Sequence, residues 1–221
     1  MRIPLVLRYT ITLLALWLSL WAMAPSHAGQ VITDDLKLWA RQSVQGESAL
    51  AFDSTANTVA VLYFQNLTGR PELDPLEKGM TLMLITDLAK MAHLEVVERA
   101  QLQALTQELA LGVSGLVDSD TAPRVGRLLG ARHLVGGFFK GLPTDAFRID
   151  ANVLNVPRDA HIGNADSSGL MDELLRMEKE ILFELLRLLD EEPTEAQRQE
   201  LMKPIAKDLR ALMFLFRGIH S

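Results

Sequence analysis

The chain interleaves short apolar runs with segments whose apolar residues recur every three or four positions, a pattern typical of strands alternating with amphipathic helices. The run Val59–Phe64 is too short for a helix and does not alternate in polarity, which predicts a central strand covered on both faces. Strict alternation over 147–153 predicts an antiparallel strand with one face toward solvent. Strands are predicted at 59–64, 94–97, 133–139, 147–153 and 162–167, with the last three forming a meander.

Helices are predicted in most of the remaining segments, from the helical spacing of their apolar residues and from their capping residues. Asp74, Pro75 and Glu77 have the order of a capping box with proline in the first turn, and Thr194 with Gln197 repeats the box near the C-terminus. Gly130 and Gly218 are expected to end helices, and Pro204 to divide the last one. The predicted helices cover 33–44, the segment from 75 to Met91, 100–109, a segment capped by Ser119 or Asp120, 170–189, and the tail after Pro193. Together these elements predict an α/β fold, with helices packed on a mixed sheet, followed by a long helix and a helical tail.

The N-terminus has the pattern of a secretory leader. Arg2 and Arg8 precede the uncharged run 9–24, and small residues at Ser26 and Ala28 fit a cleavage site. An uncleaved anchor is the alternative, but the run is shorter than the roughly 20 residues that span a bilayer. We therefore expect cleavage after Ala28, a location in the periplasm, a domain over 29–169 and C-terminal helices over 170–221.

Composition removes several classes of chemistry. The 221-residue chain contains no cysteine, so disulfides, thiolate metal sites, cysteine nucleophiles and cysteine-linked lipids are excluded. The formal net charge is -6, and it becomes -8 without residues 1–28, because 28 acidic residues then face 20 basic ones. This balance argues against nucleic acid as a partner.

Catalytic and ligand-binding motifs give little support to an enzyme. No glycine-rich phosphate loop is present, and the segment 112–115 lacks the second glycine of a nucleophile elbow, since Leu116 stands in its place. Asp118 and Asp120 resemble part of a calcium loop but have no matching glycine or glutamate, and the mature histidines are not spaced as metal ligands. The mixed charges over 172–184 are expected to lie on the solvated face of the long helix. The sequence therefore predicts no cofactor, no metal and no catalytic residue.

Two stretches of sequence resemble a known family when they are taken together. The first is VAVLYFQNLTG (59–69), followed by EKGM at the start of a helix. The second is VVER (96–99), followed by VGRLLGARHLVG (125–136). They resemble the CsgG family of curli secretion proteins and the related N-terminal domain of TolB, over roughly Leu36 to Val156. The resemblance implies a non-enzymatic protein of the bacterial envelope that acts through protein contacts in secretion, appendage or outer-membrane assembly.

The chain also departs from that family. CsgG is a lipoprotein that forms a pore from β-hairpins, whereas this chain has no lipobox cysteine and too little alternating sequence for such strands. We therefore expect the core of the fold without pore activity or membrane insertion, although peripheral association with the outer membrane stays open. The partners expected are envelope proteins or further copies of the chain.

Four residues are candidates for partner contacts. Leu67 and Arg70 lie in the loop predicted after the central strand, and Phe214 and Phe216 lie in an apolar cluster of the tail. For the two phenylalanines, packing inside the molecule is the alternative. Three other functions stay open: a ring-forming subunit of an outer-membrane or flagellar assembly, a regulator of cell-wall synthases on a similar fold, and a periplasmic hydrolase.

Overall fold

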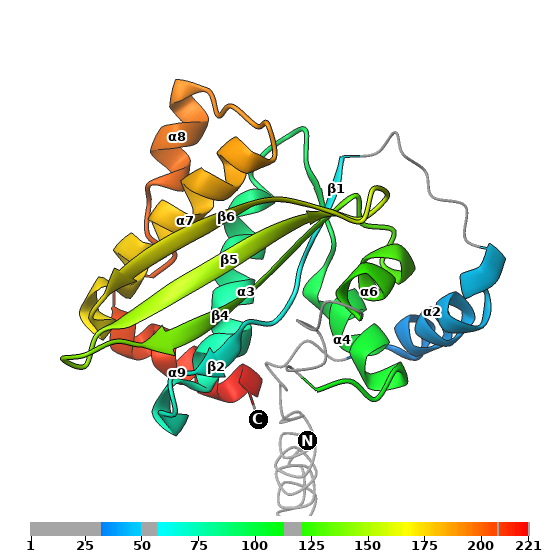
Figure 1. The fold of residues 1–221 in the computed structure, drawn as a ribbon, viewed down its shortest axis with the longest axis horizontal. Helices are drawn as coiled ribbons and strands as arrows, with labels where there is room; N and C mark the ends of the chain where they lie inside the picture. Colours follow the sequence, from blue (N-terminus) through cyan, green and yellow to red (C-terminus); the bar gives the residue numbers. More distant parts are fainter. Residues whose placement is uncertain (1–31, 50–56, 113–120, 207, 221) are drawn as a thin grey trace, which may run out of the picture. The chain divides into compact units, whose positions relative to one another are not determined.

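The structure is a computed structural model that describes residues 32–49, 57–112, 121–206 and 208–220. These residues belong to one compact unit, Ile32–Ser221 (Figure 1). The helical elements are α2 (Asp34–Gln45), η1 (Glu47–Ala49), η2 (Pro71–Leu73), α3 (Pro75–Leu88), α4 (Arg99–Glu108), α6 (Ala122–Leu128), η3 (Met171–Glu173), α7 (Leu174–Leu188), α8 (Glu195–Leu201) and α9 (Leu209–His220). The strands are β1 (Thr58–Val61), β2 (Gln65–Leu67), β3 (Glu95–Val96), β4 (His133–Gly141), β5 (Phe147–Asn155) and β6 (Ala160–Gly169).

The strands form one mixed sheet in the order β3-β1-β4-β5-β6, with β2 also pairing with β4. The pairs that involve β1 or β2 are parallel, whereas β4, β5 and β6 form an antiparallel meander. This confirms the predicted α/β class and the predicted meander, although β6 is longer than the segment 162–167 expected for it.

The central strand lies between two cores, as its unbroken apolar run predicted. All four residues of β1 are buried. Val59 and Val61 belong to a core built with α3, α7 and α9, whereas Ala60 belongs to a second core built with α4 and α6. Alternate residues of a strand point to opposite faces, so each face of β1 needs apolar side chains. In Figure 1, α3 and α7 lie on the side of the sheet away from α4 and α6.

The predicted strand 59–64 and the loop after it need a correction. Pairing of β1 stops at Val61, and a second short strand, β2, forms within the segment predicted as a loop. The amide of Phe64 donates to the carbonyl of Glu77 at 3.0 Å instead of joining the ladder. The chain thus leaves the sheet between the two strands, and β2 pairs with β4 at a point further along that strand than β1 does.

The meander has one buried face and one half-exposed face. The alternate side chains of β5 that were expected to point inward are fully buried. These are Phe147, Ile149, Ala151 and Val153. The residues between them are half-buried, because the helices of the second core do not extend over this part of the sheet (Figure 1).

The caps differ in part from the sequence prediction. Thr194 and Gln197 form the expected capping box of α8. Asp74, by contrast, makes no side-chain cap on α3, and Glu77 accepts from the amide of Asn66 at 2.9 Å, so the predicted box before α3 is wrong. Gly218 lies inside α9 rather than at its end. The predicted caps Ser119 and Asp120 lie outside the described residues.

Candidate functional site

The loop after β2 is organised by the side chain of Asn66. Its Nδ2 donates to the carbonyl oxygen of Arg70 at 2.9 Å and to Oδ1 of Asp74 at 2.7 Å. Its Oδ1 accepts from the amide of Thr68 at 3.1 Å and from the Thr68 hydroxyl at 2.6 Å. Asparagine suits this position because its amide group both donates and accepts. The loop is therefore fixed by its own hydrogen bonds, and Asp74 is used here instead of capping α3.

Two of the predicted contact residues lie at one end of the sheet: Leu67 is the last residue of β2, and Arg70 lies in the loop that follows. Leu67 is 47% exposed. The Arg70 guanidinium pairs with Glu72 at 2.9 Å and donates to the carbonyl oxygen of Asp145 at 2.9 Å, which ties the loop to the turn between β4 and β5. That turn carries Leu142, which is 40% exposed.

A third exposed leucine lies at the same end of the sheet. Leu170 follows Gly169, which pairs with Phe147, and Phe147 in turn pairs with Gly141. Leu170 is 45% exposed. We call the four residues Leu67, Arg70, Leu142 and Leu170 the sheet-end rim. Sequence reasoning missed two of its members, although Gly141 and Pro143 mark the segment of Leu142 as a turn.

The two phenylalanines of the tail have different environments. Phe216 is fully buried against α3, where its ring fills the space beside Gly79. Its position favours packing inside the molecule over contact with a partner. Phe214 is 69% exposed, and the Arg217 guanidinium lies 5.7 Å from the centre of its ring. Of this pair, Phe214 is therefore the residue accessible to a partner.

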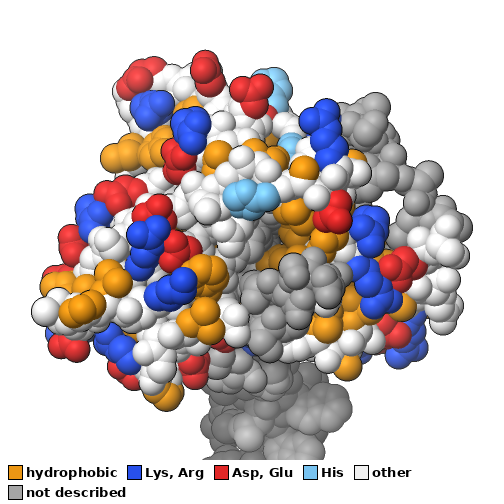
Figure 2. All heavy atoms as spheres, in the orientation of Figure 1, with side chains coloured by type: hydrophobic (Ala, Val, Ile, Leu, Met, Phe, Trp, Pro, Cys, Tyr) orange, Lys and Arg blue, Asp and Glu red, His pale blue; other side chains and the backbone are white. Residues whose placement is uncertain are grey.

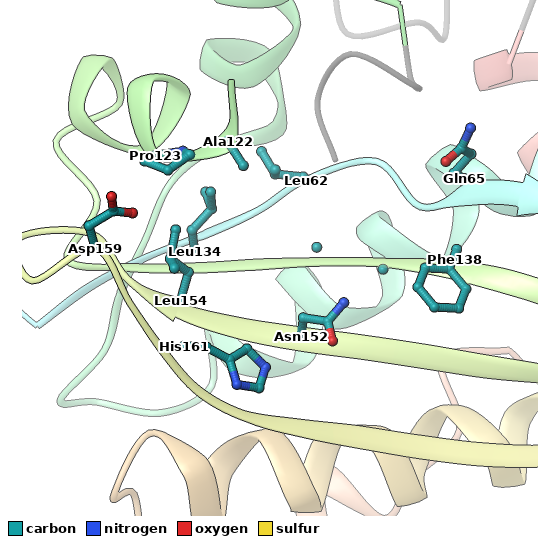
Figure 3. A pocket seen from close by; sticks show the side chains of 12 residues that line it. Leu62, Gln65, Ala122, Pro123, Leu134, Phe138, Asn152, Leu154, Asp159 and His161 are labelled. Carbon is teal, nitrogen blue, oxygen red and sulfur yellow. The ribbon is translucent and has the colours of Figure 1, made fainter. Parts of the chain in front are cut away.

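A cavity of about 490 Å³ opens on the half-exposed face of the sheet, where the helices of the second core end (Figure 3). Ala122 and Pro123 of α6 line one side, and residues of the sheet line the other. The strands contribute Gln65, Leu134, Gly136, Gly137, Phe138, Asn152, Leu154 and His161, and Leu62 and Asp159, which lie between strands, complete the lining. Figure 2, in the orientation of Figure 1, shows a histidine and a patch of hydrophobic side chains near the middle of this face.

The cavity has several polar side chains among its apolar ones. Its polar side chains are amides, one carboxylate and the His161 imidazole, whose Nε2 lies 2.5 Å from Oδ1 of Asn164. An amide and imidazole lining of this kind can exchange hydrogen bonds with a polar ligand.

A buried ionic cluster corrects the prediction that the charges of 172–184 are all solvated. Glu178 of α7 is fully buried, and Lys179 is 7% exposed. Lys179 pairs with Asp87 of α3, and Asp87 also pairs with Lys90 at 2.6 Å. Lys179 Nζ lies 3.2 Å from Glu178 Oε2, but neither carboxylate oxygen of Glu178 accepts a hydrogen bond from the described residues. Burial therefore raises the pKa of Glu178 to about 7, and the ammonium of Lys179 limits the rise.

The histidines and acidic residues do not form a metal site in the part of the chain that the structure describes. His133 is buried and its Nδ1 has no hydrogen-bond partner there, and burial together with nearby Arg132 lowers the pKa of its imidazole. The candidate residues Ser114, Asp118 and Asp120 lie outside the described residues. Over the same described ranges, none of the helices has the length and apolar character needed to cross a bilayer.

Comparisons with known proteins bear on the resemblance found in the sequence. Residues 42–142 match the family model described as curli production assembly/transport component CsgG. No curated protein matches the chain.

Several solved structures are similar to parts of the chain. The C-terminal domain of LpoB from Salmonella enterica is 18% identical, with a TM-score of 0.44, and the match covers 60% of this chain and 98% of that domain. The same domain from Escherichia coli is 21% identical, with a TM-score of 0.42, over 59% of this chain and 97% of the domain. Lipoprotein GNA1162 from Neisseria meningitidis is 10% identical, with a TM-score of 0.44, over 52% of this chain and 80% of the other. The family match confirms the resemblance, and residues 42–142 of this chain form a CsgG-like region.

Proposed function

We propose that this chain is a non-enzymatic protein of the bacterial envelope that serves as an interaction module in secretion, appendage or outer-membrane assembly. The match of residues 42–142 to the CsgG model supports the setting, because that model describes an assembly and transport component. The leader pattern of residues 1–28 supports a place of action beyond the inner membrane.

The observation that carries the proposal is the sheet-end rim. Three leucines between 40% and 47% exposed lie at one end of the sheet, and Arg70 holds two of their loops together through the carbonyl of Asp145. Exposed apolar side chains on a preorganised backbone bind with a small loss of conformational entropy, which is the property expected of a docking surface. Phe214 is a further exposed apolar residue, on α9. The carboxyl end of that helix lies near the amino end of α3, where Lys78 Nζ donates to the carbonyl oxygen of Ile219 at 3.2 Å.

The proposal is tested by cross-linking in intact cells, followed by purification of the tagged protein. We expect the wild-type chain to yield discrete cross-linked species, and Leu67→Asp to reduce their yield at least about tenfold, since a charge in an apolar contact costs 1–3 kcal/mol or more. Leu38→Asp is the matched control, because Leu38 is a 54% exposed leucine of α2, outside the rim. Equal yields from the two variants, or a wild-type protein that forms no cross-links, would contradict the proposal.

The size of the purified protein separates two forms of the proposal. Light scattering that reports a single discrete oligomer would make the partner a further copy of the chain, as in a ring-forming subunit. A monomer that cross-links only in cells would make the partner a different envelope protein, which includes a cell-wall synthase.

A further inference from the structure

A second concave surface lies between α7 and α8, and none of the residues that line it belongs to the sheet-end rim. It is a groove of about 620 Å³. It is lined by Leu175, Arg176, Lys179, Glu180, Phe183, Arg198, Met202 and Pro204. Half of these residues are apolar, and Met202 is 58% exposed. In the turn between α7 and α8, Asp190 has a positive φ of 60°.

Most charges around the groove are neutralised within the molecule. Arg176 pairs with Glu173 at 3.0 Å and with Glu180 at 2.6 Å. Glu180 also accepts from the Ser167 hydroxyl at 2.5 Å. Lys179 sends its ammonium inward to Asp87, so its contribution to the lining is the aliphatic part of its side chain.

Arg198 is the exception in this lining. Its guanidinium lies 5.1 Å from the centre of the Phe183 ring, across the gap between α8 and α7. It makes no ion pair with any carboxylate of the described residues, so its charge is uncompensated beside an apolar floor. Stacking on an aromatic ring holds the guanidinium in place while its donors stay available for a carboxylate.

This charge pattern selects one kind of occupant. A second copy that docked groove to groove would bring two uncompensated arginines together, which is unfavourable. An anionic membrane surface is attracted by clusters of basic residues. The lining of this groove has only Arg198 as a cation without an ion pair to the described residues, and the chain has a formal net charge of -6. A peptide segment that carries both an apolar side chain and a carboxylate matches the floor and Arg198 together.

We propose that the groove between α7 and α8 binds an acidic, amphipathic peptide segment of a protein partner. Apolar side chains of the segment cover Phe183 and Met202, and a carboxylate of the segment pairs with Arg198. The surface is separate from the sheet-end rim, so the inference does not depend on the function proposed above.

The test uses two short labelled peptides that differ only in charge. The first places leucine and glutamate at helical spacing, and the second has lysine in place of each glutamate. We expect the acidic peptide to bind the full chain saturably in fluorescence anisotropy, and the basic peptide to bind at least about tenfold more weakly. Backbone amide shifts in NMR spectra should change at Phe183, Arg198 and Met202.

Charge-reversal variants locate the site. Arg198→Glu and Met202→Asp should each weaken binding of the acidic peptide about tenfold or more. The first removes the positive charge that pairs with the peptide carboxylate, and the second removes part of the apolar surface. Arg187→Glu is the matched control, because Arg187 is an exposed arginine of α7 outside the groove lining. Leu67→Asp should leave peptide binding unchanged, which separates this surface from the rim.

Three outcomes would overturn the inference: no saturable binding of the acidic peptide, equal binding of both peptides, or an equal loss in Arg198→Glu and Arg187→Glu. Circular dichroism of each variant excludes loss through unfolding. A Met202→Leu variant, which keeps the apolar surface, should retain binding.

Discussion

At the scale of single residues, Glu178 is the most unusual side chain of the described core. It is fully buried on α7, and its carboxylate has Lys179 nearby but no hydrogen-bond donor among the described residues. Lys179 is shared with Asp87, which is itself paired with Lys90. A buried carboxylate without full compensation favours its protonated form, which is why its pKa rises to about 7.

This shift predicts how stability depends on pH. The pKa of Glu178 is higher in the folded chain, about 7, than its usual value of 4.5, so the folded state binds the proton more tightly than the unfolded state. The contribution of Glu178 to the free energy of unfolding is therefore fully present below about pH 4.5, and it is lost as the pH rises toward 7. Glu178→Gln, which is neutral at every pH, should raise the free energy of unfolding at pH 8 by about 2 kcal/mol and change it little at pH 5.

Urea denaturation of both proteins at several pH values between 5 and 8 measures this difference. Glu184→Gln is the control, because Glu184 lies on the same helix but is paired with Arg187 at the surface, where its pKa is lowered. If the difference in the free energy of unfolding between wild type and Glu178→Gln stayed constant from pH 5 to pH 8, the Glu178 carboxylate would not titrate as described.

At the scale of elements, α3 and α9 approach each other closely at Gly79 and Phe216. A Cβ atom at Gly79 would lie 2.5 Å from the ring of Phe216, so only glycine leaves room for that ring on α3. The sequence predicted the apolar face of this helix, but Gly79 gave no signal, because its role depends on a residue more than 130 positions away. The same reason explains the failed capping box, since Asn66 on β2 engages both Asp74 and Glu77.

Substitution of Gly79 should have opposite effects in two backgrounds. In the wild-type chain Gly79→Ala should lower the free energy of unfolding by about 1–3 kcal/mol, through overpacking against Phe216. In a Phe216→Ala background the same change should raise it by about 1 kcal/mol, because alanine favours the helix once the ring is gone.

A double-mutant cycle by chemical denaturation checks the change of sign. Phe216→Ala alone should lower the free energy of unfolding by about 3–5 kcal/mol, whereas Phe214→Ala should stay within about 0.5 kcal/mol of wild type. If Gly79→Ala destabilised both backgrounds equally, α9 would not dock on α3 in this way.

At the scale of the whole molecule, two parts of the sheet differ in how they are covered. The part around β1 has a core on each face, whereas the meander has one half-exposed face. Helices of the second core cover β1 but stop short of β5 and β6, and the cavity opens at that boundary. The sheet-end rim and the groove between α7 and α8 are distinct surfaces, so the molecule offers two separate places for contacts. This arrangement is consistent with a module that works by binding.

The predicted leader gives a further measurable expectation for the whole chain. Expressed in a bacterium with an intact secretion system, the protein should be recovered from the periplasmic fraction with Gly29 as its first residue, because small residues at Ser26 and Ala28 fit the cleavage pattern. Intact-mass spectrometry of the purified protein checks the site. A chain that keeps residues 1–28 and fractionates with membranes would support the uncleaved anchor instead.

The sequence by itself determined the order and type of most elements, the burial of β1 on both faces and the alternation of β5, because hydrophobic periodicity is a local property of the chain. It also placed Arg70 in a surface loop, whereas Leu67, predicted in the same loop, ends β2. Two motifs carried the resemblance to CsgG. Only the tertiary structure distinguished the exposed Phe214 from the buried Phe216 and buried Glu178 and Lys179 on a helix face that the sequence pattern predicted to be solvated. It also placed Leu142 and Leu170 at the same end of the sheet as Leu67. Each of these depends on which distant segment packs against the residue, and a linear pattern of polarity does not contain that information.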